Sequence, residues 1–214
     1  MQQATGCNIP GAAQAYSFNI TAVPKRGRPL GYLTIWPAGQ PQPAVSTLNA
    51  LTGTVTANAA IVPAGTGGDV LAYASGNDID LVADINGYFA PPASAPNPMS
   101  LYAMEPCRTL DTRQDPPGHP FTGELTVDVV DGRCGLPGSA TGYVLNATAV
   151  PAGALGYLTL WPDGQQQPAV STLNSLDGAI TSNMAIVPTS NGSIDSFNSN
   201  PSHLVLDISG YFAP

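Results

Sequence analysis

Short runs of alternating apolar and polar residues recur along the whole chain, each closed by Gly, Pro or Asn. Between Tyr16 and Ala22, for example, apolar side chains occupy every second position. This period of two is typical of half-buried β-strands, and no run of useful length shows the period of a helix. The predicted strands span 16–22, 31–36, 58–62, 70–74, 80–85, 107–113, 124–130, 143–150, 156–161, 183–187, 193–197 and 204–208. The pattern therefore predicts an all-β protein built as sandwiches.

Two segments of the chain are near copies of each other. Tyr32–Pro63 and Tyr157–Pro188 are identical at 23 of 32 positions with a constant offset of 125. Such self-similarity indicates an internal duplication, because each copy must bury its own apolar face. We interpret the chain as two tandem β-sandwich domains, with a first repeat at 1–92, a Pro-rich linker at 93–99 and a second repeat at 100–214.

The two copies differ at their beginnings. The second copy is preceded by Glu105–Arg133, which contains two of the predicted strands and has no counterpart before Cys7. The first copy is therefore expected to lack its N-terminal strands, which leaves sheet edges open for pairing with another chain. We expect end-to-end self-association with Cys7 near the junction. The alternative is that the stretch 91–130 covers the open edge within the same chain.

An ordered series of motifs resembles a known repeat module. The motifs are Pro106-Cys107-Arg108, Asp111-Thr112-Arg113, Cys134-Gly135-Leu136-Pro137, Gly156-Tyr157-Leu158-Thr159 and Asp207-Ile208-Ser209-Gly210-Tyr211-Phe212. The module has about 110 residues and occurs singly or in tandem in large secreted proteins of soil bacteria. The resemblance covers nearly the whole chain, although the first copy lacks the Pro-Cys-Arg and Asp-Thr-Arg motifs. It implies a secreted or cell-surface location and no particular activity.

The charge and composition exclude several classes of protein. Charged residues make up only 9 % of the chain, and 14 acidic against 6 basic residues give a net charge of −8. Nucleic-acid binding requires a Lys/Arg footprint, so no nucleic-acid partner is expected. No stretch approaches the ~18 consecutive apolar residues of a membrane helix, so membrane insertion is not predicted either. No cofactor-binding motif is found.

Three cysteines leave one over if two of them pair. Cys7 and Cys134 occupy equivalent positions in the two copies, whereas Cys107 lies in the extra segment of the second copy. We predict a Cys107–Cys134 disulfide, with Cys7 unpaired or joined to another chain. A Cys7–Cys107 bridge and three thiols are the alternatives. A disulfide indicates an oxidising compartment and therefore a secreted protein.

The sequence carries no strong catalytic motif. There is no Gly-x-Ser-x-Gly, no His-Glu-x-x-His and no Gly-rich phosphate loop, and His119 and His203 have no equivalents in the first copy. Asp84 and Asp207 are the only acidic residues that align between the copies, so a duplicated catalytic site is not expected. The carboxylate pairs left open for a secreted hydrolase are Asp195 with Asp207 and Glu105 with Asp111.

The few charges of the second copy predict an ion cluster. Arg108, Asp111 and Arg113 lie on one predicted strand and Asp207 on another. Because burying such charges singly is costly, we expect these four residues to form a structural salt-bridge network.

A weak calcium candidate lies in the first copy. Asp78 and Asp80 alternate at a turn and could offer oxygen ligands, but the twelve-residue loop of an EF-hand is absent. Asn and Asp also favour turns for backbone reasons alone. We therefore predict a polar turn and no metal site here.

Aromatic rows supply the candidate binding site. Tyr32 and Trp36 share one face of a predicted strand, and the second copy repeats them as Tyr157 and Trp161. If the opposite face lies on the core, each row forms an exposed platform for stacking a sugar ring. The alternative is that the Trp side chains pack in the core, as large aromatics usually do.

These observations give three hypotheses for function. The leading one is a non-catalytic extracellular repeat that serves as a structural or adhesive element of a bacterial cell surface, sheath or fibre. The second is a carbohydrate-binding module with a polysaccharide partner at the aromatic rows. The third is a secreted hydrolase.

Overall fold

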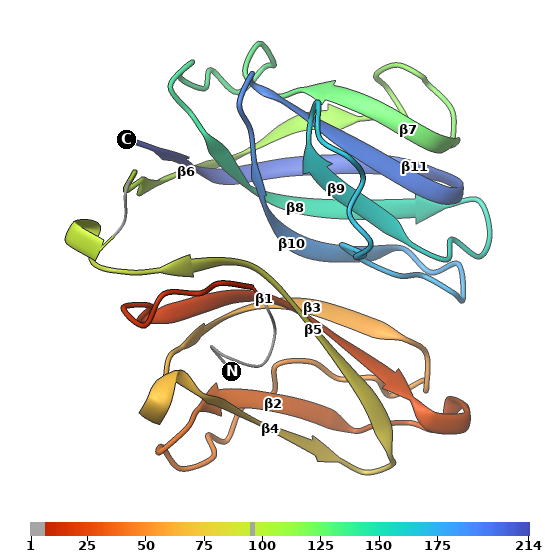
Figure 1. Ribbon diagram of the computed structural model, residues 1–214. Helices are drawn as coiled ribbons and strands as arrows, with labels where there is room; N and C mark the ends of the chain where they lie inside the picture. Colours follow the sequence, from red (N-terminus) through yellow and green to blue (C-terminus); the bar gives the residue numbers. More distant parts are fainter. Residues whose placement is uncertain (1–6, 95–96) are drawn as a thin grey trace. The chain divides into compact units, whose positions relative to one another are not determined.

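The computed structural model describes residues 7–94 and 97–214, and it is all-β as predicted (Figure 1). The chain divides into two compact units, Met1–Pro98 (unit 1) and Met99–Pro214 (unit 2), so the division falls inside the predicted linker. The helical segments of the described residues are single 3₁₀ turns, namely η1 (Lys25–Gly27), η2 (Thr66–Gly68) and η3 (Pro92–Ser94). None of the described helices is long and apolar enough to cross a membrane.

Two small antiparallel sheets form the described part of unit 1. Its strands are β1 (Ala15–Pro24), β2 (Tyr32–Pro37), β3 (Thr56–Pro63), β4 (Val70–Ser75) and β5 (Ile79–Phe89). One sheet has the order β3-β1-β5, and the other pairs β2 with β4. The core lies under alternate residues of β1, where Tyr16, Phe18 and Ile20 are buried together with Leu30 and Leu33. The apolar residues of 16–22 thus belong to the core, but the prediction of a half-buried strand is wrong for β1, because Ser17, Asn19 and Thr21 between them are buried as well.

Unit 2 is one curled antiparallel sheet that folds around its own core. Its strands are β6 (Ser100–Asp111), β7 (Phe121–Asp128), β8 (Gly142–Pro151), β9 (Leu158–Pro162), β10 (Thr181–Pro188) and β11 (Ser193–Ala213). The first part of β11 pairs with β7 and β9, and the second part pairs with β6 and β8. Tyr143, Leu145, Leu158, Leu204 and Leu206 are fully buried between these strands.

One predicted boundary is wrong in unit 2. The runs 193–197 and 204–208 were expected to be separate strands, but both belong to the continuous strand β11. Asn200 precedes Pro201, and a residue before proline favours extended backbone, so the chain passes through an irregularity without a turn. In unit 1, Gly76 adopts a φ of 105° between β4 and β5 and the chain turns there.

The strand pairings of the two units correspond. In unit 1, β1 lies between β3 and β5, just as β8 lies between β10 and the second part of β11 in unit 2. The β2–β4 pair likewise corresponds to β9 and the first part of β11. These pairings agree with the duplication inferred from the sequence, which stays an inference. In the described part of unit 1, no strand corresponds to β6 or β7.

Candidate functional site: the open sheet edges of unit 1

The predicted ion cluster fastens β6 to β11 in unit 2. Arg108 donates from Nε to Asp207 Oδ1 at 2.8 Å and from Nη2 to Asp207 Oδ2 at 3.1 Å. Arg113 donates to both oxygens of Asp111 at 2.8 and 2.6 Å, and Arg108 Nη1 lies 3.4 Å from Asp111 Oδ2. The structure thus brings together the four residues expected to pair. Two-pronged guanidinium–carboxylate contacts of this kind fix geometry as well as charge.

Asp111 is the buried member of this cluster, with 1 % of its surface exposed. Hydrogen bonds from the Arg113 guanidinium lower the pKa of Asp111 to about 2, and they outweigh the opposing effect of burial. Asp111 and Asp207 are therefore both held by arginines. A general acid needs a raised pKa, so Asp111 does not fit that role in the Glu105–Asp111 pair considered for a hydrolase.

The disulfide joins Cys107 to Cys134, as predicted. The alternative Cys7–Cys107 pairing is therefore wrong, and Cys7 carries an exposed thiol. The turns that follow Cys7 and Cys134 match, because Asn8 and Gly135 both have left-handed backbone, with φ of 50° and 63°. Asn is among the few residues besides Gly that adopt this conformation readily. The residue after Cys7 thus shares the left-handed backbone of the residue after Cys134.

In unit 2, β6 and β7 cover the long strand β11. β6 pairs with its second part and β7 with its first part. Tyr102 of β6 stacks on Tyr211 of β11 with ring centroids 5.2 Å apart. Ser196 of β11 donates its hydroxyl to the carbonyl of Leu125 on β7 at 3.0 Å. The two strands therefore pair with one edge of β11, whose other edge pairs with β8 and β9.

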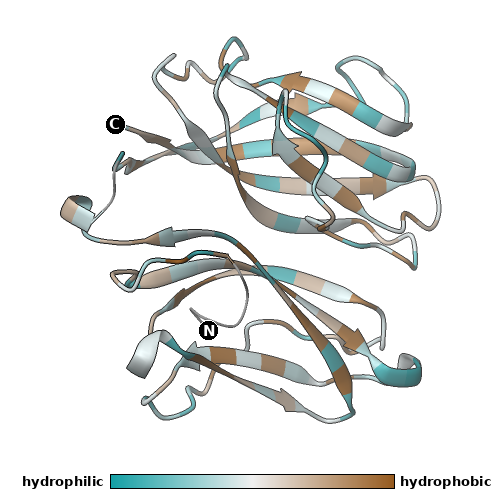
Figure 2. Ribbon diagram, in the orientation of Figure 1, coloured by the Kyte–Doolittle hydropathy of each residue, from teal (hydrophilic) through white to brown (hydrophobic). Residues whose placement is uncertain are grey.

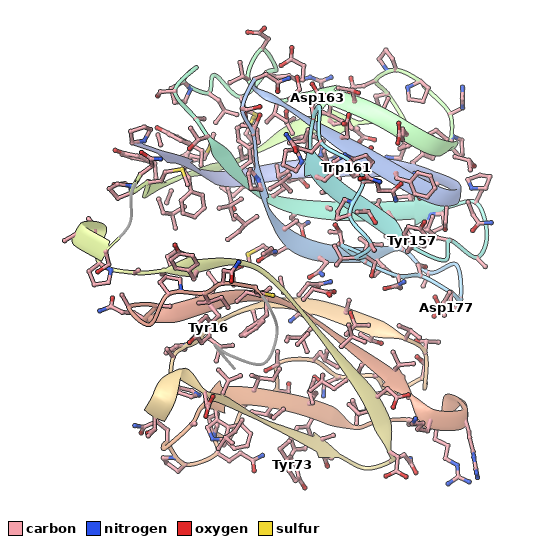
Figure 3. All side chains as sticks on the ribbon, in the orientation of Figure 1. Tyr16, Tyr73, Tyr157, Trp161, Asp163 and Asp177 are labelled. Carbon is pink, nitrogen blue, oxygen red and sulfur yellow. A yellow bond between two sulfur atoms is a disulfide. The ribbon has the colours of Figure 1, made fainter. Side chains whose placement is uncertain are left out.

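The corresponding strands of unit 1 have no such cover. Among the described residues, β5 pairs only with β1 and β4 pairs only with β2, so the outer edges of both strands are open. Their exposed large apolar side chains are Leu71 and Tyr73 on β4 and Leu81, Val82 and Tyr88 on β5. Figure 2 colours the ribbon by hydropathy, with hydrophobic positions in brown. Figure 3 shows Tyr73 projecting away from the strands of unit 1. We call these two edges and five side chains the open face.

Equivalent positions of the two units differ in exposure among the described residues. Leu81 is 41 % exposed, whereas its equivalent Leu204 is fully buried. Val82 is 44 % exposed, whereas its equivalent Val205 is 3 % exposed. The same side chains in the same local sequence are thus core residues in one unit and surface residues in the other. An exposed apolar cluster beside unpaired strand edges is typical of an interaction surface.

A carboxylate, that of Asp84 on β5, lies on the same strand as three side chains of the open face. Asp84 is the equivalent of Asp207, and no cation lies within salt-bridge distance of it among the residues the structure describes. Partial burial raises the pKa of Asp84 above its usual value. The sequence predicts open edges in the first copy, but the pattern of that copy alone does not point to Leu81, Val82 or Asp84 individually. Aligning them with Leu204, Val205 and Asp207 is the signal that could have found them.

Of the two alternatives for the aromatic rows, packing of the tryptophan in the core holds for the second copy. Trp161 is only 3 % exposed, and its indole N–H donates to the carbonyl of Gln165 at 3.0 Å (Figure 3). Tyr157 is half-buried and stacks on Phe197 with centroids 5.5 Å apart. The strand face that was expected to meet solvent is covered, because Thr159 on that face is buried and donates to the carbonyl of Val170 at 2.8 Å.

The aromatic row of unit 1 is more accessible. Tyr32 and Trp36 are half-buried, and the indole N–H of Trp36 donates to the carbonyl of Gln40 at 3.0 Å. Trp36 lines a shallow pocket of about 360 Å³ whose polar members include Thr47 and Asn58. Ala59 also lines this pocket, and the second copy carries the larger Met184 at that position.

Asp78 and Asp80, the weak calcium candidates, both interact with Lys25. Asp80 forms a salt bridge with Lys25 at 2.7 Å, and the carbonyl of Asp78 accepts a hydrogen bond from the Lys25 backbone N–H at 2.9 Å. Within 7–94 and 97–214, no three His, Cys, Asp or Glu side chains gather as metal ligands. His119 contacts the carbonyl of its neighbour Pro120, and His203 contacts the hydroxyl of Thr112 at 3.3 Å.

Comparisons with protein families, with curated proteins and with solved structures found no match for the chain.

Proposed function

We propose that the chain is a non-catalytic structural or adhesive repeat of an extracellular assembly such as a bacterial surface layer, sheath or fibre. The observation that carries the proposal is the open face of unit 1, where apolar side chains lie beside unpaired strand edges. Such edges pair with strands of other molecules. The Cys107–Cys134 disulfide supports an oxidising, extracytoplasmic setting.

End-to-end association is the behaviour this function requires. A contact between the open face and a different surface of the next molecule is heterologous, so it produces chains or rings rather than a closed dimer. Light scattering over a concentration series should show the mean mass rising without a plateau at the dimer. Salt should have little effect on the mass if apolar contact and backbone pairing dominate.

A pair of variants tests whether the open face is responsible. Leu81→Lys places a charge on the face and should return the protein to a monomer. Leu51→Lys is the matched control, because Leu51 is also an exposed leucine of unit 1 but lies outside β4 and β5. The control should associate like the parent protein. A parent protein that stays monomeric at high concentration would refute the proposed assembly.

A second candidate function is polysaccharide binding at the Trp36 pocket. The half-buried indole beside Thr47 and Asn58 offers a stacking surface with nearby polar groups. A pull-down with insoluble polysaccharides should then retain the protein, and Trp36→Ala should abolish retention without unfolding unit 1. Trp161→Ala should instead destabilise unit 2 by ~3–5 kcal/mol, as for an emptied aromatic core site. Retention that survives Trp36→Ala would remove this candidate.

A further inference from the structure

The turn that follows β1 concentrates positive charge. Lys25, Arg26 and Arg28 are half of the six basic residues in a chain whose net charge is −8. Unit 2 carries no charge at the equivalent place, because the segment between Pro151 and Gly156 reads Ala-Gly-Ala-Leu and is two residues shorter than 25–30. The fold of the repeat therefore does not require a basic turn.

The backbone of this turn is unusual for its residues. Arg26 is left-handed, with φ 57° and ψ 27°, and Gly27 follows with a φ of 65°. The N–H of Arg28 donates to the carbonyl of Lys25 at 3.2 Å. Positive φ at both central residues is the geometry of a type I′ turn, where Asn, Asp or Gly is preferred at the first central position. The exposed side chain of Arg26 gains no core packing that would offset this strain, which is typical of functional positions.

Contacts with the loop between β4 and β5 hold the turn in place. The Lys25 N–H donates to the carbonyl of Asp78 at 2.9 Å, and the Lys25 ammonium group pairs with Asp80 at 2.7 Å. The amide of Asn77 donates to the carbonyl of Pro29 at 2.8 Å. The charge of Lys25 is thus neutralised within the protein, and the turn is held at both ends. A turn held in this way loses little conformational freedom when it binds a ligand.

The two arginines of the turn have no anionic partner among the described residues. Neither the Arg26 nor the Arg28 guanidinium takes part in a salt bridge within 7–94 and 97–214, although the chain has 14 acidic residues. The other arginines of the chain, Arg108, Arg113 and Arg133, each pair with an aspartate. Two neighbouring guanidiniums without carboxylates are available to an external anion.

Both arginines line one pocket of about 270 Å³, together with Lys25, Asn77 and Asp78. Two planar guanidiniums beside the same space suit a tetrahedral oxyanion, because a single guanidinium already occupies both oxygens of a carboxylate. We propose that this pocket, the basic pocket, binds the sulfate or phosphate groups of an acidic polysaccharide. The inference goes beyond the proposed function, since it assigns a charged ligand to a site outside the open face and the Trp36 pocket.

The small net charge of the basic pocket favours a polysaccharide over a nucleic acid. Because Asp80 neutralises Lys25, the two arginines face the one carboxylate that lines the pocket, that of Asp78, which leaves two positive charges against one negative charge. Nucleic acids are bound through many phosphate contacts at once. A polysaccharide with spaced acidic groups needs only one such group in the pocket. The Cys107–Cys134 disulfide supports the extracellular setting in which the chain would meet such a polymer.

The test measures the affinity of the full chain for immobilised dextran sulfate, with uncharged dextran as the reference. Physiological ionic strength screens the general repulsion between the acidic chain and the polymer, so the parent protein should bind dextran sulfate and not dextran. Arg26→Gln and Arg28→Gln should each weaken binding roughly fivefold, the upper range for an exposed ion pair, and together roughly 25-fold. Arg133→Gln is the matched control, because it removes the same charge from unit 2 and should leave the affinity unchanged. Equal losses with Arg133→Gln and the turn variants would overturn the site.

Two further changes test the chemistry of the basic pocket. Asp78→Asn removes the opposing carboxylate and keeps the backbone carbonyl that holds Lys25, so the affinity should rise roughly threefold. Replacing Arg26 and Arg28 together by lysine keeps both charges and removes the planar guanidiniums, so the affinity should fall roughly threefold. An unchanged affinity in the lysine variant would show that unspecific charge attraction is sufficient, and would refute the proposed oxyanion site.

Soluble competitors identify the class of ligand. Inorganic sulfate and phosphate carry the oxyanion without the polymer, and they should displace the chain from dextran sulfate less effectively per anion than soluble dextran sulfate does. Equal displacement would assign the basic pocket to a free anion instead. Polygalacturonate, whose charges are carboxylates, should also compete less well than dextran sulfate. Double-stranded DNA that binds as tightly as dextran sulfate would transfer the site to nucleic acids and refute the proposal.

Discussion

The two equivalent leucines Leu81 and Leu204 provide a direct test of how pairing with β6 and β7 changes the contribution of a leucine to stability. Leu204 is fully buried in unit 2, so Leu204→Ala removes core contacts and leaves a cavity. The expected loss of unfolding free energy is about 3 kcal/mol, within the usual range for a buried leucine. Leu81 is already 41 % exposed, and its truncation leaves no enclosed cavity. Scaling the transfer free energy of a leucine by its buried fraction gives a loss of roughly 1 kcal/mol for Leu81→Ala.

The two tryptophans allow each unit to be followed separately. Trp36 lies in unit 1 and Trp161 in unit 2, and the chain contains no other tryptophan. Fluorescence during urea unfolding therefore reports unit 1 in a Trp161→Phe background and unit 2 in a Trp36→Phe background. The leucine variants are compared with their own background, so the effect of the phenylalanine cancels. Equal losses in the two units would refute the claim that the open face is uncovered in solution.

Two further predictions concern unit 2. Cys134→Ser should lower its unfolding free energy by about 3.5 kcal/mol, the chain-entropy value for a disulfide spanning 27 positions, and should leave unit 1 unchanged in the same fluorescence assay. Asp111 has a pKa lowered to about 2 from an ordinary 3.8, so its stabilising contribution is complete above about pH 4 and is lost as the pH falls towards 2. Asp111→Asn should abolish that part of the acid dependence in unfolding curves measured between pH 2 and 5, and an unchanged dependence would contradict the assignment.

The disulfide and the ion cluster could be predicted from the sequence. Aligning the two copies shows which cysteines have equivalents, and the few charged residues of the second copy have few possible partners. Cys107 lies in the segment that only the second copy contains, and Cys134 has its equivalent in Cys7. The scarcity of charge made Arg108 and Asp207 natural partners, and they pair. Most strands were predicted for a similar reason, since a sheet with one buried face imposes a period of two on its residues.

The environment of the tryptophans could not be predicted, because it depends on a distant segment of the chain. Alternation placed Trp161 and Thr159 on the same face, but periodicity cannot show what covers that face. In the fold, the loop that contains Val170 returns across the strand and accepts the hydroxyl of Thr159. The continuity of β11 could not be predicted either. The strand continues through Asn200 and Pro201 because other strands pair with it on both sides, and the sequence pattern does not show these pairings.

The pairing of Ser100 with Ala213 has a mechanical consequence for unit 2. These residues lie at the start of β6 and the end of β11, so the chain enters and leaves the unit at neighbouring positions of one ladder. Tension between these two ends opens the ladder one residue pair at a time instead of loading all of its hydrogen bonds together. Peeling proceeds until it reaches Cys107, which lies opposite Ile208. There the disulfide transfers the load directly to Cys134. The segment between the two cysteines, which contains β7, is therefore not extended, and the disulfide stops further peeling of β6.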